Sequence, residues 1–318
     1  MAKIIFMGTP EIAVPTLEAL NNCFGIDVVV TTPDKPKGRG MQLTSSPVKQ
    51  KAQELNIEVL QPLDLKSIDF IDKLRQISPD LIVVFAFKFL PKEVYTLAKI
   101  AAFNIHTSLL PEYRGAAPIS WAIINGEKTT GLTTFILEDK IDGGPIIMQK
   151  EIAIPLNSTA GDLTDIIMNV VPNFAITTCK KLISRECNPT IQAVKSNKLA
   201  PKIYKNTAEI NWMESAIKVK NFINGYSPQP CAWTTWDDIK LQILRAKLPD
   251  IDAIKNNMGI ISEFNKAGEF YITKNTMFVN CGDYNVIELV EIKPANKNTL
   301  LIKNFINGYK GNKQGIFR

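Results

Sequence analysis

Apolar runs alternate with helically spaced apolar positions along the first 183 residues. Short runs rich in β-branched and other apolar residues predict strands at 3–7, 27–31, 80–87, 132–137 and 146–154, and a further strand that ends in Asn104-Ile105-His106. Between them, apolar residues recur at helical spacing around 12–20, 48–55, 68–77, 92–98, 118–124, 160–168 and 172–183. This alternation predicts an α/β fold with a doubly wound, parallel sheet.

The pattern changes in the last hundred or so residues. A helix is expected at 214–223, and then short β-prone runs at 232–236, 239–246, 258–264, 269–273, 276–281 and 286–292, with a last helix at 300–306. Several short strands separated by turn residues predict a small barrel or sandwich. We therefore expect a first domain at 1–188, a linker rich in Asn, Pro, Lys and Ser at 189–211, and a second domain at 212–318.

One long polar stretch, residues 32–47, interrupts the alternation. It holds two glycines, three prolines and the cations Lys35, Lys37 and Arg39, which predicts a solvated loop. Loops longer than about 12 residues without secondary structure are uncommon in compact domains, so its length favours a functional role. The preceding Gly8-Thr9-Pro10 lacks the G-x-G-x-x-G pattern, which argues against a nicotinamide site.

Composition narrows the class of protein. The formal net charge is +6, and residues 202–318 hold 16 Lys/Arg against 11 Asp/Glu, so an anionic partner would bind the C-terminal part. Five widely spaced cysteines and a single histidine fit neither a disulfide framework nor a zinc site. No apolar run is long enough to span a membrane and no signal peptide is evident, so a cytoplasmic protein is expected.

The single histidine, His106, is the centre of the candidate chemistry. Asn104 lies two residues before it, so both side chains would point to the same face at the carboxyl end of a strand, where α/β sheets bind ligands. A structural, hydrogen-bonded histidine would also fit this position. With Asp142 available, however, the set suits acyl transfer: Asn donates to an oxyanion, His moves a proton, and Asp favours the charged imidazole.

The stretch Phe-Asn-Ile-His-Thr-Ser-Leu-Leu-Pro-Glu-Tyr-Arg-Gly-Ala-Ala-Pro-Ile at 103–119, with Ile-Asp-Gly-Gly at 141–144, resembles the folate-dependent formyltransferase family. The similarity extends over nearly the whole chain, including Gly38-Arg39-Gly40, Ala200-Pro201-Lys202-Ile203, Ile210-Asn211-Trp212 and Ala232-Trp233-Thr234. It implies a Rossmann-like formyltransferase domain followed by an OB-like β-barrel.

The resemblance also implies substrates and roles. The donor would be 10-formyltetrahydrofolate as co-substrate, with no metal, and the acceptor would be the amine of initiator methionyl-tRNA. Asn104, His106 and Asp142 would be the catalytic set. The folate pocket would be lined by Ser108, Leu109, Leu110 and Pro111, and the tRNA would contact Lys35, Lys37 and Arg39. A monomer is expected.

The chain departs from the family after its central strand. Where the family has an Ala-Tyr-Gly-like segment, this chain has Ala86-Phe87-Lys88-Phe89, which leaves the folate contacts there open. Two alternatives remain at this point: a sugar-nucleotide or glycinamide-ribotide formyltransferase, which would share the triad, and a non-catalytic RNA-binding relative. The basic loop and the charge of the C-terminal part favour tRNA as the acceptor, and the intact triad favours an enzyme.

Overall fold

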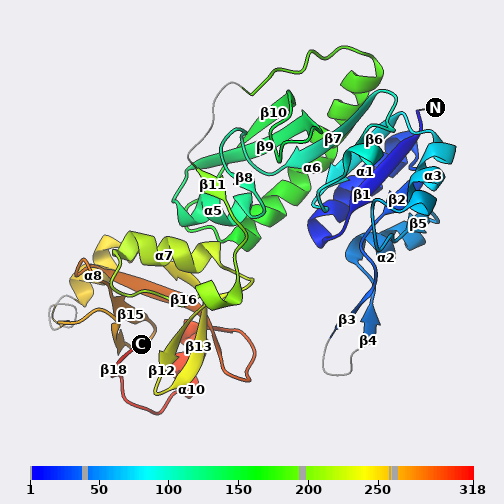
Figure 1. The fold of residues 1–318 in the computed structure, drawn as a ribbon. Helices are drawn as coiled ribbons and strands as arrows, with labels where there is room; N and C mark the ends of the chain where they lie inside the picture. The colour runs from blue at the N-terminus through cyan, green and yellow to red at the C-terminus, as the bar shows by residue number, and fades with distance from the viewer. Residues whose placement is uncertain (1, 38–41, 193–197, 258, 260–263) are drawn as a thin grey trace. The chain divides into compact units, whose positions relative to one another are not determined.

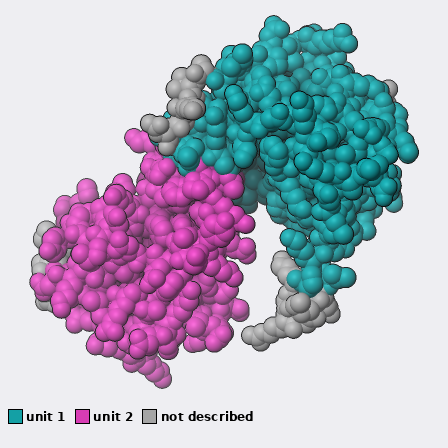
Figure 2. Space-filling model, in the orientation of Figure 1, with its two compact units in different colours: residues 1–115, 130–153, 164–199 teal, residues 116–129, 154–163, 200–318 magenta. Residues whose placement is uncertain are grey.

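A computed structural model of the chain describes residues 2–37, 42–192, 198–257, 259 and 264–318. These residues form two compact units (Figure 2). Unit 1 comprises Met1–Gly115, Thr130–Ala153 and Thr164–Leu199, and unit 2 comprises Ala116–Thr129, Ile154–Leu163 and Ala200–Arg318. Unit 2 therefore takes two segments from the part of the chain whose pattern predicts the α/β sheet.

Unit 1 is built on one seven-stranded sheet of order β10-β9-β7-β6-β1-β2-β5 (Figure 1). Its strands are β1 Ile4–Gly8, β2 Val28–Val30, β5 Glu58–Leu60, β6 Leu81–Phe85, β7 Ala101–His106, β9 Thr129–Ile136 and β10 Ile146–Ala153. Every residue of β1 and β6 is buried, as expected for central strands covered on both faces. Five neighbouring strands, from β7 to β5, run parallel, which confirms the predicted fold class.

The next strand, β9, instead runs antiparallel to β7, with His106 opposite Thr133. The connection between them includes the short helix α5 (Pro118–Ile124), which belongs to unit 2. Because the pair is antiparallel, the chain leaves β7 and enters β9 at the same end of the strands.

The helices of unit 1 largely follow the predicted ranges. They are η1 Glu11–Ala13, α1 Val14–Phe24, α2 Pro47–Glu54, α3 Ile68–Ile77, α4 Lys92–Tyr95 and most of α6 Ala160–Ile183. The predicted break between residues 168 and 172 is wrong, because α6 continues through Pro172. Val171, Phe174 and Ala175 are buried around the proline, and this burial offsets a helix-interior cost of about 3 kcal/mol.

The polar stretch 32–47, predicted to be a loop, contains two short strands. Strands β3 (Lys35–Lys37) and β4 (Gln42–Thr44) pair antiparallel into a hairpin that stands away from the sheet (Figure 1). At its base, Asp34 accepts hydrogen bonds from Lys49 Nζ at 2.6 Å and from Gln61 Nε2 at 2.8 Å. These bonds, Lys49 first, lower the pKa of Asp34, so a charged anchor holds the hairpin.

Unit 2 contains an antiparallel sheet of order β12-β13-β16-β15-β14-β18, with β17 paired to β16. Its strands are β12 Ala232–Trp236, β13 Ile239–Lys247, β14 Glu269–Ile272, β15 Met277–Asn280, β16 Val286–Pro294, β17 Leu300–Leu301 and β18 Gln314–Ile316. Register shifts in β13 on both sides of Arg245 fit a sheet that curves. The arrangement is consistent with the expected OB-like barrel.

Helices of unit 2 accompany this sheet, and α7 and α10 among them contribute buried residues to its core. They are η2 Lys205–Thr207, α7 Ala216–Gly225, α8 Ile251–Asn256 and α10 Ile302–Gly308. The predicted strand at 258–264 falls mostly on residues 258 and 260–263, which lie outside the described residues. The short elements β5, α8 and β18 have no counterpart among the sequence-based predictions.

Unit 2 also includes α5 and the segment Ile154–Leu163. Helix α5 packs on α7 so closely that a methyl group on Gly225 would lie 2.9 Å from the carbonyl oxygen of Ser120. Arg245 on β13 makes two hydrogen bonds to the Asp162 carboxylate, at 2.7 and 2.8 Å. Trp121 Nε1 donates to Pro201 O at 2.8 Å. These contacts join residues before 164 to the barrel.

Candidate active site

Strand β7 places both Asn104 and His106 at the carboxyl edge of the sheet. Asn104 lies between Val84 of β6 and Phe135 of β9, and His106 is the last residue of the strand. Asn104 is half-buried, and within the described part of the chain its side-chain amide has no hydrogen-bond partner. The strand therefore presents an unengaged amide two residues from the imidazole, as the alternation of side chains requires.

His106 is buried, with 6% of its surface exposed. Its Nε2 lies 2.9 Å from the backbone carbonyl oxygen of Tyr113, and Nδ1 lies 4.0 Å from Asp142 Oδ2. A carbonyl oxygen can only accept, so Nε2 must carry a proton and donate it. In the neutral ring the lone pair is then on Nδ1, the nitrogen that faces the carboxylate.

Asp142 lies in the turn between β9 and β10 with a left-handed backbone, at φ +48°. Its Oδ2 accepts a hydrogen bond from the backbone N–H of Gly115 at 2.9 Å, and its side chain is 14% exposed. The structure therefore brings His106 and Asp142 together across 36 residues of sequence. Asp142 can stabilise a charged His106 at this distance because both groups are largely shielded from water.

The turn that carries Asp142 is fixed at two further points. Tyr95 donates its hydroxyl to Asp139 Oδ1 at 2.7 Å, and this bond raises the pKa of Tyr95 to about 12. Gly144 passes so close to Ile136 that a methyl group in its place would overlap the carbonyl oxygen of Ile136. A glycine is thus required at 144 for the approach of two backbones.

The predicted folate-pocket residues Ser108, Leu109, Leu110 and Pro111 follow His106 directly. Ser108 and Leu110 are buried, whereas Leu109 and Pro111 are half-buried and keep accessible side-chain surface. Thr133 Oγ1 donates to Ser108 O at 2.7 Å and accepts from Leu110 N at 3.1 Å. The backbone of this segment is therefore held firmly to β9.

A cavity of about 590 Å³ lies at the same carboxyl edge of the parallel strands. Its lining comes from the segments after β5 and β6 and from the turn before Asp142: Leu63, Asp64, Leu65, Lys66, Lys88, Phe89, Pro91, Lys92, Glu93 and Asp139. This volume is typical of small-ligand sites. Phe87, where the chain departs from the family pattern, packs on the core of unit 1, while Phe89 is 57% exposed.

Two of the three cations predicted to contact tRNA, Lys35 and Lys37, belong to strand β3. Lys35 is exposed on β3, and the backbone of Lys37 ends that strand. Arg39 lies outside the described residues. Lys35 therefore lies on strand β3, whereas Asn104 and His106 lie on β7 and Asp142 lies in the turn after β9.

Two contacts of the candidate site could not be predicted from the sequence. The carbonyl oxygen of Tyr113 holds His106, and no sequence signal marks it because every residue carries a carbonyl group. The side chain of Gln192 reaches the Asp142 turn, with Nε2 3.0 Å from Asp142 O. Gln192 lies in the segment predicted to be a linker, where its neighbours gave no indication of a contact.

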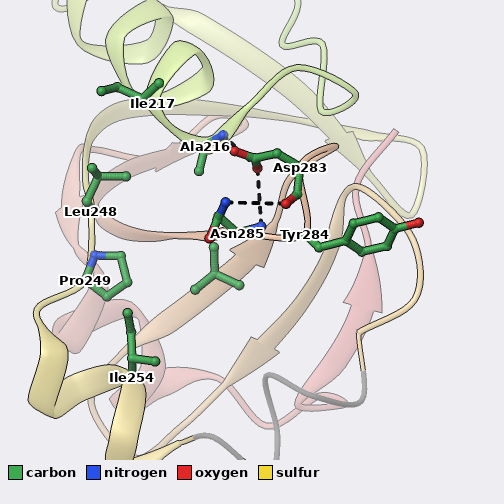
Figure 3. A pocket seen from close by; sticks show the side chains of 9 residues that line it. Ala216, Ile217, Leu248, Pro249, Ile254, Asp283, Tyr284 and Asn285 are labelled. Atoms are coloured by element: carbon green, nitrogen blue, oxygen red, sulfur yellow. Dashed lines mark hydrogen bonds between the residues drawn. The ribbon is translucent and has the colours of Figure 1, made fainter.

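A second cavity, of about 320 Å³, lies in unit 2 between the start of α7, the turn before β16 and helix α8 (Figure 3). Asp283 is its acidic group, and that carboxylate accepts from the backbone N–H groups of Ala216 and Asn285 at 3.1 and 3.2 Å. The Asp283 carboxylate is therefore already engaged by backbone N–H groups. The remaining lining is largely apolar, and the cavity carries none of the predicted chemistry.

Among the described residues, no group of three His, Cys, Asp or Glu side chains is placed to hold a metal ion. No helix in the described ranges is long and apolar enough to cross a membrane.

Comparison with known proteins agrees with this architecture. The formyl transferase family matches residues 2–178, and the formyl transferase C-terminal domain matches residues 202–310. The methionyl-tRNA formyltransferase of Clostridium perfringens (strain 13 / Type A) is 41% identical over 309 residues, 96% of each chain. That of Clostridioides difficile (strain 630) is 39% identical over 308 residues, also 96% of each chain.

Solved structures with the same fold are more distant in sequence. An N-formyltransferase from Helicobacter canadensis, in complex with folinic acid and dTDP-3-aminofucose, has a TM-score of 0.65 at 20% identity and covers 91% of this chain and 99% of its own. HypX from Aquifex aeolicus, in complex with tetrahydrofolic acid, has a TM-score of 0.62 at 16% identity, over 96% of this chain and 47% of its own. With both domains matched in order and full-length relatives at about 40% identity, the chain belongs to the formyl transferase family.

Proposed function

We propose that this protein transfers the formyl group of 10-formyltetrahydrofolate to the free amino group of initiator methionyl-tRNA, in support of translation initiation. The observation that carries the proposal is the pair of His106 Nδ1 and Asp142 Oδ2, 4.0 Å apart at the end of β7. The names of the full-length relatives support the choice of acceptor.

In this proposal His106 moves the proton. The uncharged amine attacks the formyl carbon directly, and since an α-amino group has a pKa near 8, a share of it is neutral at cellular pH. His106 Nδ1 takes a proton from the amine as the new C–N bond forms. It returns that proton to N10 of the folate as the C–N10 bond breaks, which leaves tetrahydrofolate and the N-formylated aminoacyl-tRNA.

Asn104 and Asp142 stabilise the two charges that develop, the oxyanion and the imidazolium. The unengaged amide of Asn104 donates to the oxyanion that forms from the formyl oxygen. Asp142 stabilises the imidazolium formed when Nδ1 is protonated, while Tyr113 O keeps the other N–H occupied. No covalent enzyme intermediate is needed.

The substrates would occupy different elements. The folate would bind against the segment Ser108–Pro111, whose backbone is fixed on β9 by Thr133. The acceptor stem of the tRNA would contact Lys35, Lys37 and Arg39, and phosphates would bind these cations. Strands β3 and β4 stand away from the sheet (Figure 1), and Lys35 is exposed on β3. We expect the folate contacts to survive loss of the hairpin cations.

A second candidate is a sugar-nucleotide formyltransferase, since the H. canadensis protein shares the fold. One experiment separates the acceptors. The protein is incubated with 10-formyltetrahydrofolate and either charged initiator tRNA or a dTDP-amino sugar, and the N-formyl product is quantified. Formylation of the aminoacyl-tRNA alone supports the proposal, and formylation of the sugar alone would replace it. Absence of any product, with tRNA bound, would favour an RNA-binding relative.

A further inference from the structure

We propose that Gln192 is a positioning residue that holds the Asp142 turn in register with His106. This inference rests on the proposed role of Asp142. Within the described residues, the side chain of Gln192 makes hydrogen bonds with Asp142, Gly144 and Arg114, none of which is proposed to contact a substrate, so an effect on the reaction has to pass through the Asp142 turn or the segment around Arg114.

The side-chain amide of Gln192 has a partner for each of its polar atoms. Nε2 donates to Asp142 O at 3.0 Å and to Gly144 O at 2.7 Å, and Oε1 accepts a hydrogen bond from the Arg114 guanidinium. The reverse orientation would place an oxygen against two carbonyl oxygens and an NH₂ group against a cation. The three partners therefore fix the amide in one orientation.

The backbone beside Gln192 is fixed as well. Thr190 and Ile146 exchange two backbone hydrogen bonds, both 2.8 Å, so the segment before Gln192 pairs with the first residue of β10. The turn 139–145 leads directly into this residue. The backbone next to Gln192 is therefore fixed to the start of β10, and from there the Gln192 side chain bonds to the turn that precedes β10.

Arg114, the third partner of Gln192, belongs to the segment that bonds to both His106 and Asp142. Arg114 lies between Tyr113, whose carbonyl oxygen accepts from His106, and Gly115, whose N–H donates to Asp142. The segment 113–115 therefore contacts the turn in two ways: Gly115 bonds to the Asp142 carboxylate, and Arg114 is linked through Gln192 to the backbone of Asp142 and Gly144. Asp142 has a left-handed backbone conformation, which is uncommon for residues other than glycine although aspartate adopts it more readily than most, and the bond from Gln192 to its carbonyl oxygen helps to maintain it.

The variant Gln192→Leu tests the proposal, because it keeps the approximate size of the side chain and removes all three hydrogen bonds. We expect kcat to fall about 10²-fold, the loss typical of a reacting group displaced by about 1 Å. The KM values for both substrates should change far less, because neither is proposed to touch Gln192. Gln192→Glu keeps an acceptor for Arg114 but has no N–H for the turn, and should lose a similar factor.

The decisive measurement is the double variant with Asp142→Asn. If Gln192 acts through Asp142, adding Gln192→Leu to Asp142→Asn causes little further loss of kcat. The inference would be overturned if the kcat of the double variant fell by the product of the two single losses, or if both Gln192 variants kept a near-normal kcat. Ile191→Ala, at a neighbouring residue that is 78% exposed, is the matched control and should retain the wild-type rate.

The same set of proteins tests the proposed function separately. A normal kcat in Asp142→Asn alone would refute the proposed site. A slow Asp142→Asn beside an unaffected Gln192→Leu would leave the site standing and refute only the role of Gln192. Should Gln192→Leu fold poorly, as judged by its circular dichroism and melting temperature, Gln192→Glu decides the same question.

Discussion

His106 and Tyr113 are joined by a hydrogen bond of 2.9 Å from the ring Nε2–H to the backbone carbonyl oxygen. Because the acceptor belongs to the main chain, no single side-chain substitution at Tyr113 removes it. The bond fixes the tautomer of the neutral ring and leaves Nδ1 as the nitrogen that would exchange protons in the proposed reaction. A structural histidine would not require a carboxylate on its other side, and Asp142 occupies that position.

Substitution of His106 by Ala is expected to lower kcat by about 10²- to 10⁴-fold, the usual contribution of general acid–base catalysis. The reason is the loss of the only imidazole in the chain. The measurement is steady-state formylation of methionyl-tRNA, with folate binding followed in parallel. If turnover stays near the wild-type value, His106 is structural and the proposed mechanism is wrong.

Gly144→Ala and Gly143→Ala form a matched pair. A methyl group at 144 would overlap the carbonyl oxygen of Ile136, a backbone atom, whereas one at 143 would lie 2.9 Å from the Cβ atom of Lys140. We expect Gly144→Ala to displace the Asp142 turn and to lower kcat by about 10²-fold, and Gly143→Ala to have a smaller effect. Equal rates for the two variants would show that the turn tolerates displacement.

Arg39→Ala is expected to raise the KM for methionyl-tRNA, and to leave the KM for 10-formyltetrahydrofolate almost unchanged. Loss of one phosphate contact should also reduce the slope of log affinity against log salt concentration by about 1. Arg75→Ala is the control, since Arg75 is an exposed arginine of α3 paired with Asp72. Equal salt slopes for wild type and Arg39→Ala would contradict the proposed contact.

Asp162→Asn tests the ion pair with Arg245. The pair lowers the folded-state pKa of Asp162, chiefly through the hydrogen bonds from Arg245. A lowered pKa stabilises the folded state above the ordinary value of 3.8, and this stabilisation is lost as the pH falls through the lower folded value. Because the carboxylate is 38% exposed, solvent screening limits the effect to about 1 kcal/mol at pH 7.

The measurement for Asp162→Asn is urea unfolding at pH 7 and at pH 3. The variant should be less stable than wild type at pH 7, and the difference should shrink at pH 3. Asp165→Asn, an exposed carboxylate one turn along the same helix, should show no such pattern. A stability difference that does not depend on pH would mean that the lost hydrogen-bond geometry, not the charge, is responsible.

Much of unit 1 could be predicted because its strands are buried on both faces. β1, β6 and β7 are apolar runs of the expected length, and the two-residue spacing of Asn104 and His106 follows from strand geometry alone. The roles of these residues, of Ser108 to Pro111 and of the hairpin cations stay predictions, as do the domain limits at 188 and 211, the cytoplasmic location and the monomeric state.

What could not be predicted depends on contacts between distant residues. Strands β3 and β4 are only three residues each, β3 consists of one proline between two lysines, and the Asp34 anchor lies at the base of the hairpin. Pro172 predicts a helix end from local sequence, but burial on α6 outweighs it. The contact of Gln192 joins residues 50 positions apart, and a local polar composition gives no indication of such a partner.

The packing of α5 and of Asp162 with the barrel determines where this protein can be divided. Cleavage of the gene near codon 188 or 211 would give a first half that still carries helix α5 and the Asp162 carboxylate, separated from Gly225 and Arg245. Each half would expose a surface made for the other and should be poorly soluble when expressed alone. Produced together, the halves should reassociate, whereas a protein engineer who wants independent modules would have to transplant residues 116–129 and 154–163 with the barrel.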